Sequence, residues 1–254
     1  MSDDAILTAE RISHAYAVDG GMLPAVEDVS LELTRESFVC LIGPSGCGKS
    51  TFLRILSGLL RPRFGWARLE GQPITRPQRR IGLVFQQANL MPWRTVRGNL
   101  ALPLQLAGLP AHRVHERTDA MLEMLGLQDF GGTYPAALSG GMAQRVAIGR
   151  ALIHEPEVLL LDEPFGSLDA LTREHMSEEL LRLWAKQRKT VLMVTHSIPE
   201  AVLLADRVVV FSPRPGRIVC DMPIPLPRPR SLHLLRHPDF IALSEELRAA
   251  IRVG

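Results

Sequence analysis

The stretch GPSGCGKST at residues 43–51 decides the fold. It fits the pattern G-x-x-x-x-G-K-[ST], in which a glycine-rich loop surrounds an anion with its backbone N–H groups. An apolar run, FVCLI at 38–42, comes before it, and a helical apolar pattern, FLRILSGL at 52–59, comes after it. The order strand, loop, helix puts the loop at a helix N-terminus, where the helix dipole favours a phosphate. The sequence therefore predicts a phosphate-binding loop in an α/β fold.

Two side chains of this loop suit a nucleoside triphosphate with its magnesium ion. Lys49 offers a positive charge to the β- and γ-phosphates, and the Ser50 hydroxyl can ligate Mg²⁺. The chain has only three lysines, at 49, 186 and 189, so abundance does not explain a lysine in the loop. The other residues that we expect at the phosphates are Gly43, Pro44, Ser45, Gly46, Cys47, Gly48 and Thr51.

A second pattern supplies carboxylates. VLLLDEP at 158–164 joins an apolar run, typical of a parallel strand buried on both faces, to Asp162 and Glu163. Asp162 falls at the carboxyl end of that strand, the edge where open α/β sheets bind ligands, so we expect it to orient Mg²⁺ through water. Glu163 comes one residue later, where a carboxylate can take a proton from an attacking water.

A third pattern is LSGGMAQRVAIGRAL at 138–152. Ser139 can cap a helix there, and Gly140 and Gly141 leave backbone N–H groups open to an anion. The segment resembles the signature of ABC ATPases, with Met142 in place of the usual glutamine. The resemblance extends over residues 5–220, because the loop, signature, Asp-Glu strand and later motifs follow in that family's order. It implies the ATP-binding, ATP-hydrolysing subunit of an ABC transporter.

The resemblance also implies roles for four further residues. Tyr16 corresponds to an aromatic that stacks on adenine, and Gln86, ending the run IGLVFQ, to a glutamine that holds a Mg²⁺-bound water and the attacking water. His196, after TVLMVT, corresponds to a histidine that binds the γ-phosphate. Asp169, in SLD at 167–169, corresponds to a residue that crosses between two subunits.

Each of these four assignments has an alternative from the residues alone. Tyr16 suits a strand end, because aromatic residues favour strands. Gln87 replaces Gln86 if the register differs by one residue. Asp169 can cap a helix at 170–186, and His196 can be a capping or buried histidine.

The resemblance implies partners as well. ABC ATPases form a head-to-tail homodimer on binding ATP, in which Ser139 and Gly141 of one subunit close on the γ-phosphate held by the other. Leu90, Met91 and Trp93 form an apolar cluster that corresponds to a groove for a permease helix; the alternative is a buried core cluster. LMPWRTV, RPGRIV at 214–219 and the proline-rich stretch at 222–230 resemble the nitrate, sulfonate and taurine importer branch. A periplasmic solute-binding protein would then act indirectly.

The composition narrows the possible partners and the possible location of the protein. The net charge of +2 over 254 residues does not favour nucleic acid as a partner. Three scattered cysteines favour no disulfide framework, and no signal peptide or apolar run of about 18 residues is present. Together with the resemblance, this implies a peripheral protein on the cytoplasmic face of the inner (cell) membrane. The alternatives are an importer subunit for another small solute, or a soluble ABC ATPase outside transport.

The pattern along the chain predicts one ABC ATPase unit in three parts. Residues 1–94 and 156–220 form a RecA-like α/β core with a mostly parallel sheet and an antiparallel edge. Residues 95–155 form a helical subdomain, and 221–254 a C-terminal extension with a helix at 237–252. Predicted strands within the core are 5–12, 27–33, 65–71, 81–86 and 158–162, with 212–219 as a turn between two more.

Overall fold

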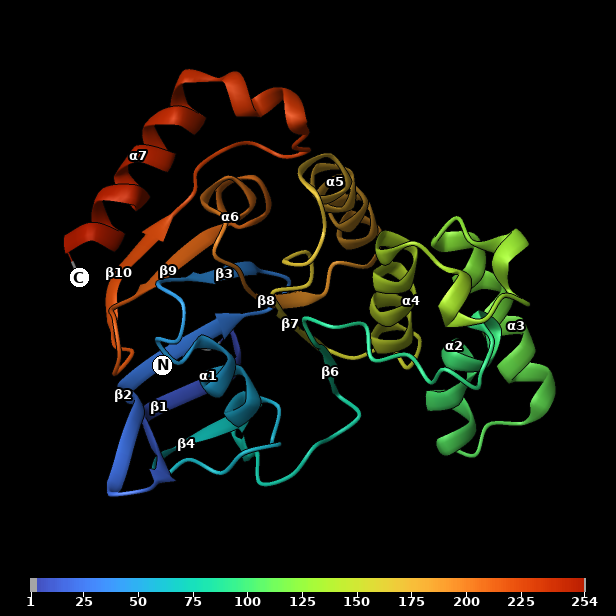
Figure 1. The fold of residues 1–254 in the computed structure, drawn as a ribbon, viewed down its shortest axis with the longest axis horizontal. Helices are drawn as coiled ribbons and strands as arrows, with labels where there is room; N and C mark the ends of the chain where they lie inside the picture. Colours follow the sequence, from blue (N-terminus) through green and yellow to red (C-terminus); the bar gives the residue numbers. More distant parts are fainter. Residues whose placement is uncertain (1–3, 254) are drawn as a thin grey trace.

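The computed structural model describes residues 4–253 and contains two β-sheets (Figure 1). The larger sheet has the strand order β10-β9-β3-β8-β7-β6 and the smaller one β2-β1-β4-β5. The strands of the larger sheet are β3 (Phe38–Ile42), β6 (Ile81–Val84), β7 (Val158–Asp162), β8 (Thr190–Val194), β9 (Arg207–Phe211) and β10 (Ile218–Pro223). Those of the smaller sheet are β1 (Ala5–Val18), β2 (Gly21–Thr34), β4 (Phe64–Leu69) and β5 (Gln72–Pro73).

The larger sheet is parallel except at one edge. β3, β6, β7, β8 and β9 pair in parallel, and β10 pairs antiparallel with β9. Every residue of β3, β7 and β8 is buried, because helices or the second sheet cover both faces. This explains their unbroken apolar runs and confirms the predicted α/β class.

The two faces of this sheet belong to separate hydrophobic cores. Val39 and Leu41 of β3 join the core that contains α1 (Lys49–Leu56) and the smaller sheet. Phe38, Cys40 and Ile42 join the core that contains α5 (Ala170–Gln187) and α6 (Ile198–Leu204). Alternation along a strand therefore fixes α1 beneath the sheet and α5 and α6 above it (Figure 1).

The first two strands are longer than predicted. β1 and β2 form a hairpin in which Val18 pairs with Gly21, so the loop expected between residues 12 and 27 does not exist. Residues 16–24 of this hairpin are exposed and lack an alternating apolar pattern, which is why the sequence did not mark them as strand.

Helices fill the chain between β6 and β7. They are α2 (Val96–Leu106), α3 (Ala111–Met124) and α4 (Gly140–Leu152), with 3₁₀ turns η1 (Gln128–Phe130) and η2 (Pro135–Ala137). The buried Asn99 side chain donates to the carbonyls of Met91, Arg94 and Thr95 and accepts from Met91 N, so α2 fixes the preceding loop. The division at residues 95–155 stays a prediction.

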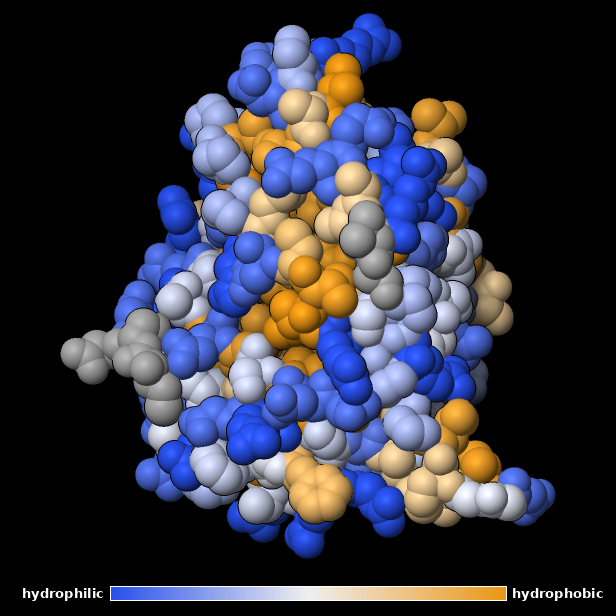
Figure 2. All heavy atoms as spheres, turned by 90° about the vertical axis from the view of Figure 1, so that its left-hand side faces the viewer, coloured by the Kyte–Doolittle hydropathy of each residue, from blue (hydrophilic) through white to orange (hydrophobic). Residues whose placement is uncertain are grey.

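After β10, an extended segment leads to η3 (Leu232–Arg236) and α7 (Pro238–Val253). α7 lies against α6 and β9, with Phe240 and Leu247 buried (Figure 1). The side of the molecule that carries α7 and β10 shows a band of hydrophobic residues between hydrophilic ones (Figure 2). Within residues 4–253, no helix combines the length and apolarity needed to cross a bilayer.

Candidate functional site

A cavity of about 360 Å³ opens above the glycine-rich loop. It brings together residues from β1, β2, the loop, α1 and the segments after β6, β7 and β9. Of the sequence-predicted residues, the lining includes Tyr16, Ser45, Gly46, Gly48, Lys49, Ser50, Thr51, Gln86 and Glu163.

The loop conformation depends on glycine. Gly48 has φ 108° and is the N-cap of α1, which begins at Lys49 rather than at the predicted residue 52. A Cβ at Gly48 would lie 2.3 Å from the Ala25 carbonyl oxygen, so no other residue fits without moving β2. The loop therefore presents its backbone at the start of a helix, as an anion site requires.

Lys49 lies inside the loop. Its ammonium donates to the carbonyls of Gly43 and Pro44, each at 2.9 Å, and the residue is only 4% exposed. Cys47 Sγ lies 3.9 Å from the same ammonium, and burial raises the pKa of that thiol. The positive charge is thus held by neutral carbonyls and stays free to pair with an anion.

Ser50 and Asp162 meet although they lie 112 residues apart. The Ser50 hydroxyl donates to Asp162 Oδ1 at 2.7 Å. The pKa of the Asp162 carboxyl is raised, mainly by burial and also by the negative charge of neighbouring Glu163. The hydrogen bond from Ser50 acts in the opposite direction and lowers this pKa. A hydroxyl and a buried carboxylate beside a second carboxylate are oxygen groups that suit Mg²⁺.

Glu163, His196 and Gln86 converge beside this pair. His196 Nδ1 lies 3.2 Å from Glu163 Oε2, and Glu163 has φ 44° with its N–H donating to Val194 O at 3.0 Å. A Cβ on Gly166 would come within 3.3 Å of Gln86 Nε2 and 3.4 Å of Glu163 Oε2. The prediction that Gln86 ends the strand was wrong, because β6 ends at Val84, two residues earlier. The strand ends there because Val84 is the last residue of β6 that pairs with β7.

A buried polar network supports the His196 loop. Thr195 donates to Glu200 Oε2 at 2.6 Å, and Thr195 Oγ1 accepts from Ser197 N at 3.0 Å. Arg173 Nε lies 3.5 Å from Glu200 Oε1, and Arg173 Nη2 donates to Leu168 O at 3.0 Å. The network therefore joins the segment before α5 to the segment before α6.

Tyr16 reaches the loop from β1. Its hydroxyl lies 3.1 Å from Thr51 Oγ1, and its ring meets His14 edge-on with centroids 5.0 Å apart. The residue is 36% exposed, so part of the ring is free for a ligand. Tyr16 belongs to β1 and lines the cavity, and its stacking on adenine stays a prediction.

Four of the predicted residues that do not line the cavity lie at the starts of α4 and α5. Ser139 caps α4 by accepting from Met142 N at 3.2 Å, and Gly140 and Gly141 follow it in the first turn. Asp169 caps α5 by accepting from Thr172 N, as the alternative reading predicted. A Cβ on Gly141 would lie 3.1 Å from the Thr172 side chain, so the two helix starts are neighbours.

Arg214 is a lining residue that the sequence did not single out. Its Nε donates to Gly46 O at 2.9 Å across 168 residues of chain. Leu23, Pro24 and Ala25 of β2 also line the cavity. The sequence shows Arg214 only as a basic residue between two prolines in SPRPG. That pattern predicts a turn, but it does not indicate which part of the chain the turn contacts.

Trp93 lies on the surface. It is 71% exposed, whereas Leu90 is partly buried against the larger core. Met91 is partly buried, and its backbone is held by Asn99. The interpretation of this cluster as buried core is therefore wrong for Trp93, which is exposed on a segment whose backbone Asn99 holds on both sides of it.

Comparisons with known proteins agree with this geometry. The family model described as "ABC transporter" matches residues 26–166. The chain is 46% identical to the nitrate import ATP-binding protein NrtD of Synechococcus elongatus (86% of this chain, 81% of that one). It is 42% identical to the aliphatic sulfonates import protein SsuB of Bacillus cereus (89% and 88%), and 43% identical to the taurine import protein TauB of Roseobacter denitrificans (90% and 87%).

A solved structure shares the fold. The ATP-binding cassette MJ0796, a dimer in a post-hydrolysis state bound to ADP and Pi, superposes with a TM-score of 0.76. It is 32% identical in sequence, and the match covers 86% of this chain and 98% of that one.

Proposed function

Because this chain belongs to the ABC transporter ATP-binding family, whose members bind and hydrolyse ATP, we propose that it drives uptake of a small anionic solute through a separate permease. The proposed solute is of the nitrate, sulfonate or taurine type, as in the import proteins to which it is similar. The observation that carries the hydrolytic part is that Glu163 and Gln86 line the cavity that holds Lys49, with His196 Nδ1 3.2 Å from Glu163 Oε2.

In this proposal the loop holds the phosphates. Backbone N–H groups of residues 45–51 surround the β-phosphate, and Lys49 exchanges its carbonyl partners for phosphate oxygens. Tyr16 packs against the adenine, and the Arg214 guanidinium, fixed by Gly46, adds positive charge at the loop.

Glu163 accepts a proton from the attacking water as general base. The His196 ring, 3.2 Å from that carboxylate, orients it and contacts the γ-phosphate. The Gln86 amide, brought near Glu163 by the absence of a side chain on Gly166, holds the water without adding charge.

Ser50, Asp162 and Gln86 would hold Mg²⁺. The 2.7 Å contact between hydroxyl and carboxylate shows that two suitable oxygens already face each other. Within residues 4–253 no group of three or more His, Cys, Asp or Glu side chains suits a metal, so phosphate oxygens and water would complete the shell. When bound, the ion neutralises charge that develops on the phosphates.

A second copy completes the site. Ser139, Gly140 and Gly141 do not line the cavity of their own chain; at the start of α4, Ser139 and Gly140 are exposed and Gly141 is buried behind them. We infer that they close on the γ-phosphate held by a partner, with Asp169 crossing at the same interface, so that ATP joins two chains head to tail. A periplasmic solute-binding protein acts through the permease, and the chain sits at the cytoplasmic face of the membrane.

ATP-dependent association tests the proposal. Glu163→Gln is expected to keep ATP binding, to lower turnover by about 10²–10⁴-fold, and to elute as a dimer with ATP. Adding Ser139→Arg is expected to abolish that dimer, because a long cation replaces the cap at the helix start. Hydrolysis at the wild-type rate by Glu163→Gln would refute its role, and a dimer that survives Ser139→Arg would refute the shared site.

A further inference from the structure

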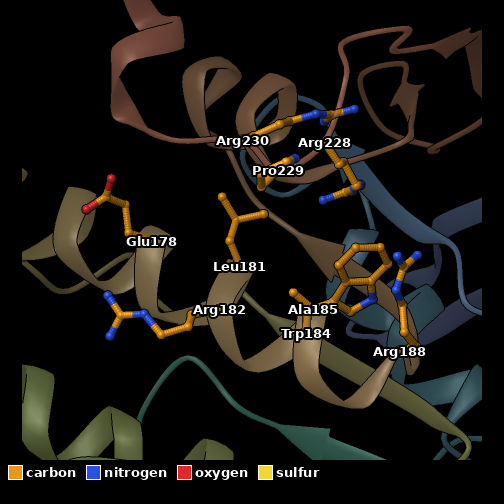
Figure 3. A pocket seen from close by; sticks show the side chains of 9 residues that line it. All are labelled: Glu178, Leu181, Arg182, Trp184, Ala185, Arg188, Arg228, Pro229 and Arg230. Atoms are coloured by element: carbon orange, nitrogen blue, oxygen red, sulfur yellow. The ribbon is translucent and has the colours of Figure 1, made fainter.

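A second cleft, about 490 Å³ in volume, lies between α5 and the extended segment after β10 (Figure 3). One wall is the face of α5 from Glu178 to Arg188, and the other is residues 228–230. It shares no residue with the cavity at the glycine-rich loop. We call it the arginine cleft.

The sequence of the extended segment changes character at this cleft. Prolines occupy positions 223, 225, 227 and 229, and the residues between them turn inward. The first two inward residues, Ile224 and Leu226, are buried aliphatic side chains, but the next two are Arg228 and Arg230. Aliphatic residues would close the cleft at no electrostatic cost, whereas two guanidinium groups in this position lose hydration. Arg230 is almost fully buried and donates to carbonyls of this segment and of α6, whereas part of the Arg228 side chain stays exposed, so Arg228 is the arginine of this segment that a ligand can reach.

Positive charge at this end of the cleft exceeds the available carboxylate. Asp206 accepts from Arg228 at 2.8 Å and lies 3.8 Å from Arg230, so one carboxylate serves two guanidinium groups. Arg188 forms no ion pair among residues 4–253; its guanidinium lies over the Trp184 ring, 5.3 Å from the centroid. Burial, and then Arg228, lower the pKa of Arg230 to about 10. Three arginines and one aspartate leave two positive charges without a partner carboxylate.

The arginines are held in fixed places. Arg228 lies 4.0 Å from the centroid of the Trp184 ring, and Trp184 Nε1 donates to Lys189 O at 2.7 Å. Figure 3 shows Arg188 and Arg228 together at the Trp184 end, with Glu178 and Arg182 at the opposite end. Guanidinium groups stacked on an aromatic ring lose little further freedom on binding, which favours an oxyanion.

The rest of the lining is short and apolar. Leu181, Ala185 and Pro229 form the middle of the cleft, and the small Ala185 leaves space between Leu181 and Arg188. Trp184 is 5% exposed and covered by arginine, so it offers no free face to a nucleobase. This lining suits a ligand in which a short aliphatic chain is attached to an oxyanion.

The cleft also touches the helix that follows His196. Arg230 Nη1 donates to Val202 O at 3.2 Å and Ala205 O at 2.6 Å, and Arg228 Nη2 donates to Leu204 O at 2.8 Å. These carbonyls end α6, whose N-cap is Ser197. Drawing the Arg228 guanidinium toward a ligand would weaken its hold on the Leu204 carbonyl at the end of α6, and with it the position of His196.

We propose that the arginine cleft binds a small aliphatic oxyanion of the alkanesulfonate or alkanecarboxylate type, and that the bound anion slows ATP hydrolysis. The binding stands on the cleft alone; the slowing rests on the proposed function of His196. An anion held between Arg188 and Arg228 competes with Asp206 and with the Leu204 carbonyl for the same donors.

Trp184 fluorescence tests the binding. In a chain with Trp66→Phe and Trp93→Phe, Trp184 is the only tryptophan. We expect 1-propanesulfonate, added at constant ionic strength, to change the emission saturably and to bind more tightly than sulfate. Arg188→Asn should weaken this binding about tenfold or more, because a charge-assisted contact is lost while asparagine tolerates the φ of 46° at that position. Lys186→Gln, which removes a charge from the same helix outside the cleft, should change it less than twofold.

Ala185→Leu supplies a variant that fills the cleft without changing charge. It should abolish the preference for propanesulfonate over sulfate. A linear, unsaturable response, or binding that ignores Arg188→Asn and Ala185→Leu, would overturn the site.

Steady-state ATPase at saturating ATP tests the slowing. Propanesulfonate should lower kcat several-fold in the chain with its native tryptophans and leave Arg188→Asn unaffected. Saturable binding with unchanged kcat would overturn the regulatory half of the proposal. Failure of the Glu163→Gln test would instead refute the proposed catalytic role and leave the fluorescence result standing.

Discussion

Replacing Trp93 by alanine separates a docking surface from a packing residue. An indole enclosed in a core removes up to about 250 Å² from water, and its truncation costs about 3–5 kcal/mol. Trp93 is 71% exposed, so less than a third of that area is hidden. About 70 Å² at about 25 cal/mol/Å² gives about 2 kcal/mol as an upper bound on the loss of stability.

The loss should be small because the segment is fixed by other residues. Asn99, fully buried, holds the backbone of Met91, Arg94 and Thr95 through four hydrogen bonds that Trp93→Ala leaves intact. For a chain of this size about 2 kcal/mol corresponds to a fall in Tm of about 4–8 °C. The isolated subunit should therefore stay folded and keep its basal ATPase.

The assay is a thermal melt of the isolated subunit, followed by assembly with the permease that the proposed function requires. Trp66→Ala is a matched control, because Trp66 is also an exposed tryptophan, on β4, far along the chain from this segment. We expect Trp93→Ala to lose assembly and Trp66→Ala to retain it. A Tm lower by about 10 °C or more with assembly preserved would refute the reasoning, because Trp93 would then stabilise the fold and not the contact.

Three further predictions concern the nucleotide site. Lys49→Ala should weaken MgATP binding and abolish turnover, measured by nucleotide titration and steady-state ATPase; unchanged values would mean that the loop is not the site. Arg214→Ala should raise the KM for ATP several-fold with a smaller change in kcat, since its guanidinium is fixed by Gly46 at the cavity wall; an unchanged KM would make it purely structural. Burial is the main cause that raises the pKa of the Glu200 carboxyl above its ordinary value of 4.5. The folded chain therefore binds the carboxyl proton more tightly than the unfolded chain does. The resulting stabilisation is complete below pH 4.5 and is lost as the pH rises through the folded pKa. The stability of the wild type relative to Glu200→Gln should therefore fall from about pH 4.5 upward in denaturant titrations, and a flat difference would contradict the raised pKa.

Local patterns determined the core and the loop of this protein. Five-residue runs such as FVCLI and VLLLD predict buried parallel strands because they carry no polar face, and both strands have the predicted bounds. The spacing of glycines and Lys49 predicts the phosphate-binding loop, since the required backbone conformation depends on residue type at each position. Ser139 and Asp169 are N-caps for the same local reason.

The tertiary structure decided what distant segments bring together. Arg214 reaches Gly46 across 168 residues, and no local pattern could predict that contact. The burial of each side chain was equally unpredictable: in the apolar segment LMPW, Trp93 is exposed and Leu90 packs against the core, because Asn99 of α2 and Arg150 of α4 hold the backbone of that loop.

The arginine cleft shows most plainly what the sequence alone could not predict. MPIPLPRPR predicts an extended segment because proline fixes its own φ and restricts the residue before it; in the structure β10 ends at Pro223, residues 224–227 have no regular secondary structure, and the chain bends at 228 and 229. Which residues face inward, and that Arg228 meets Trp184 and the end of α6, depends on where the segment crosses α5. Local chemistry sets the backbone conformation of a segment, whereas the charges and rings that gather around it come from parts of the chain that only folding makes neighbours.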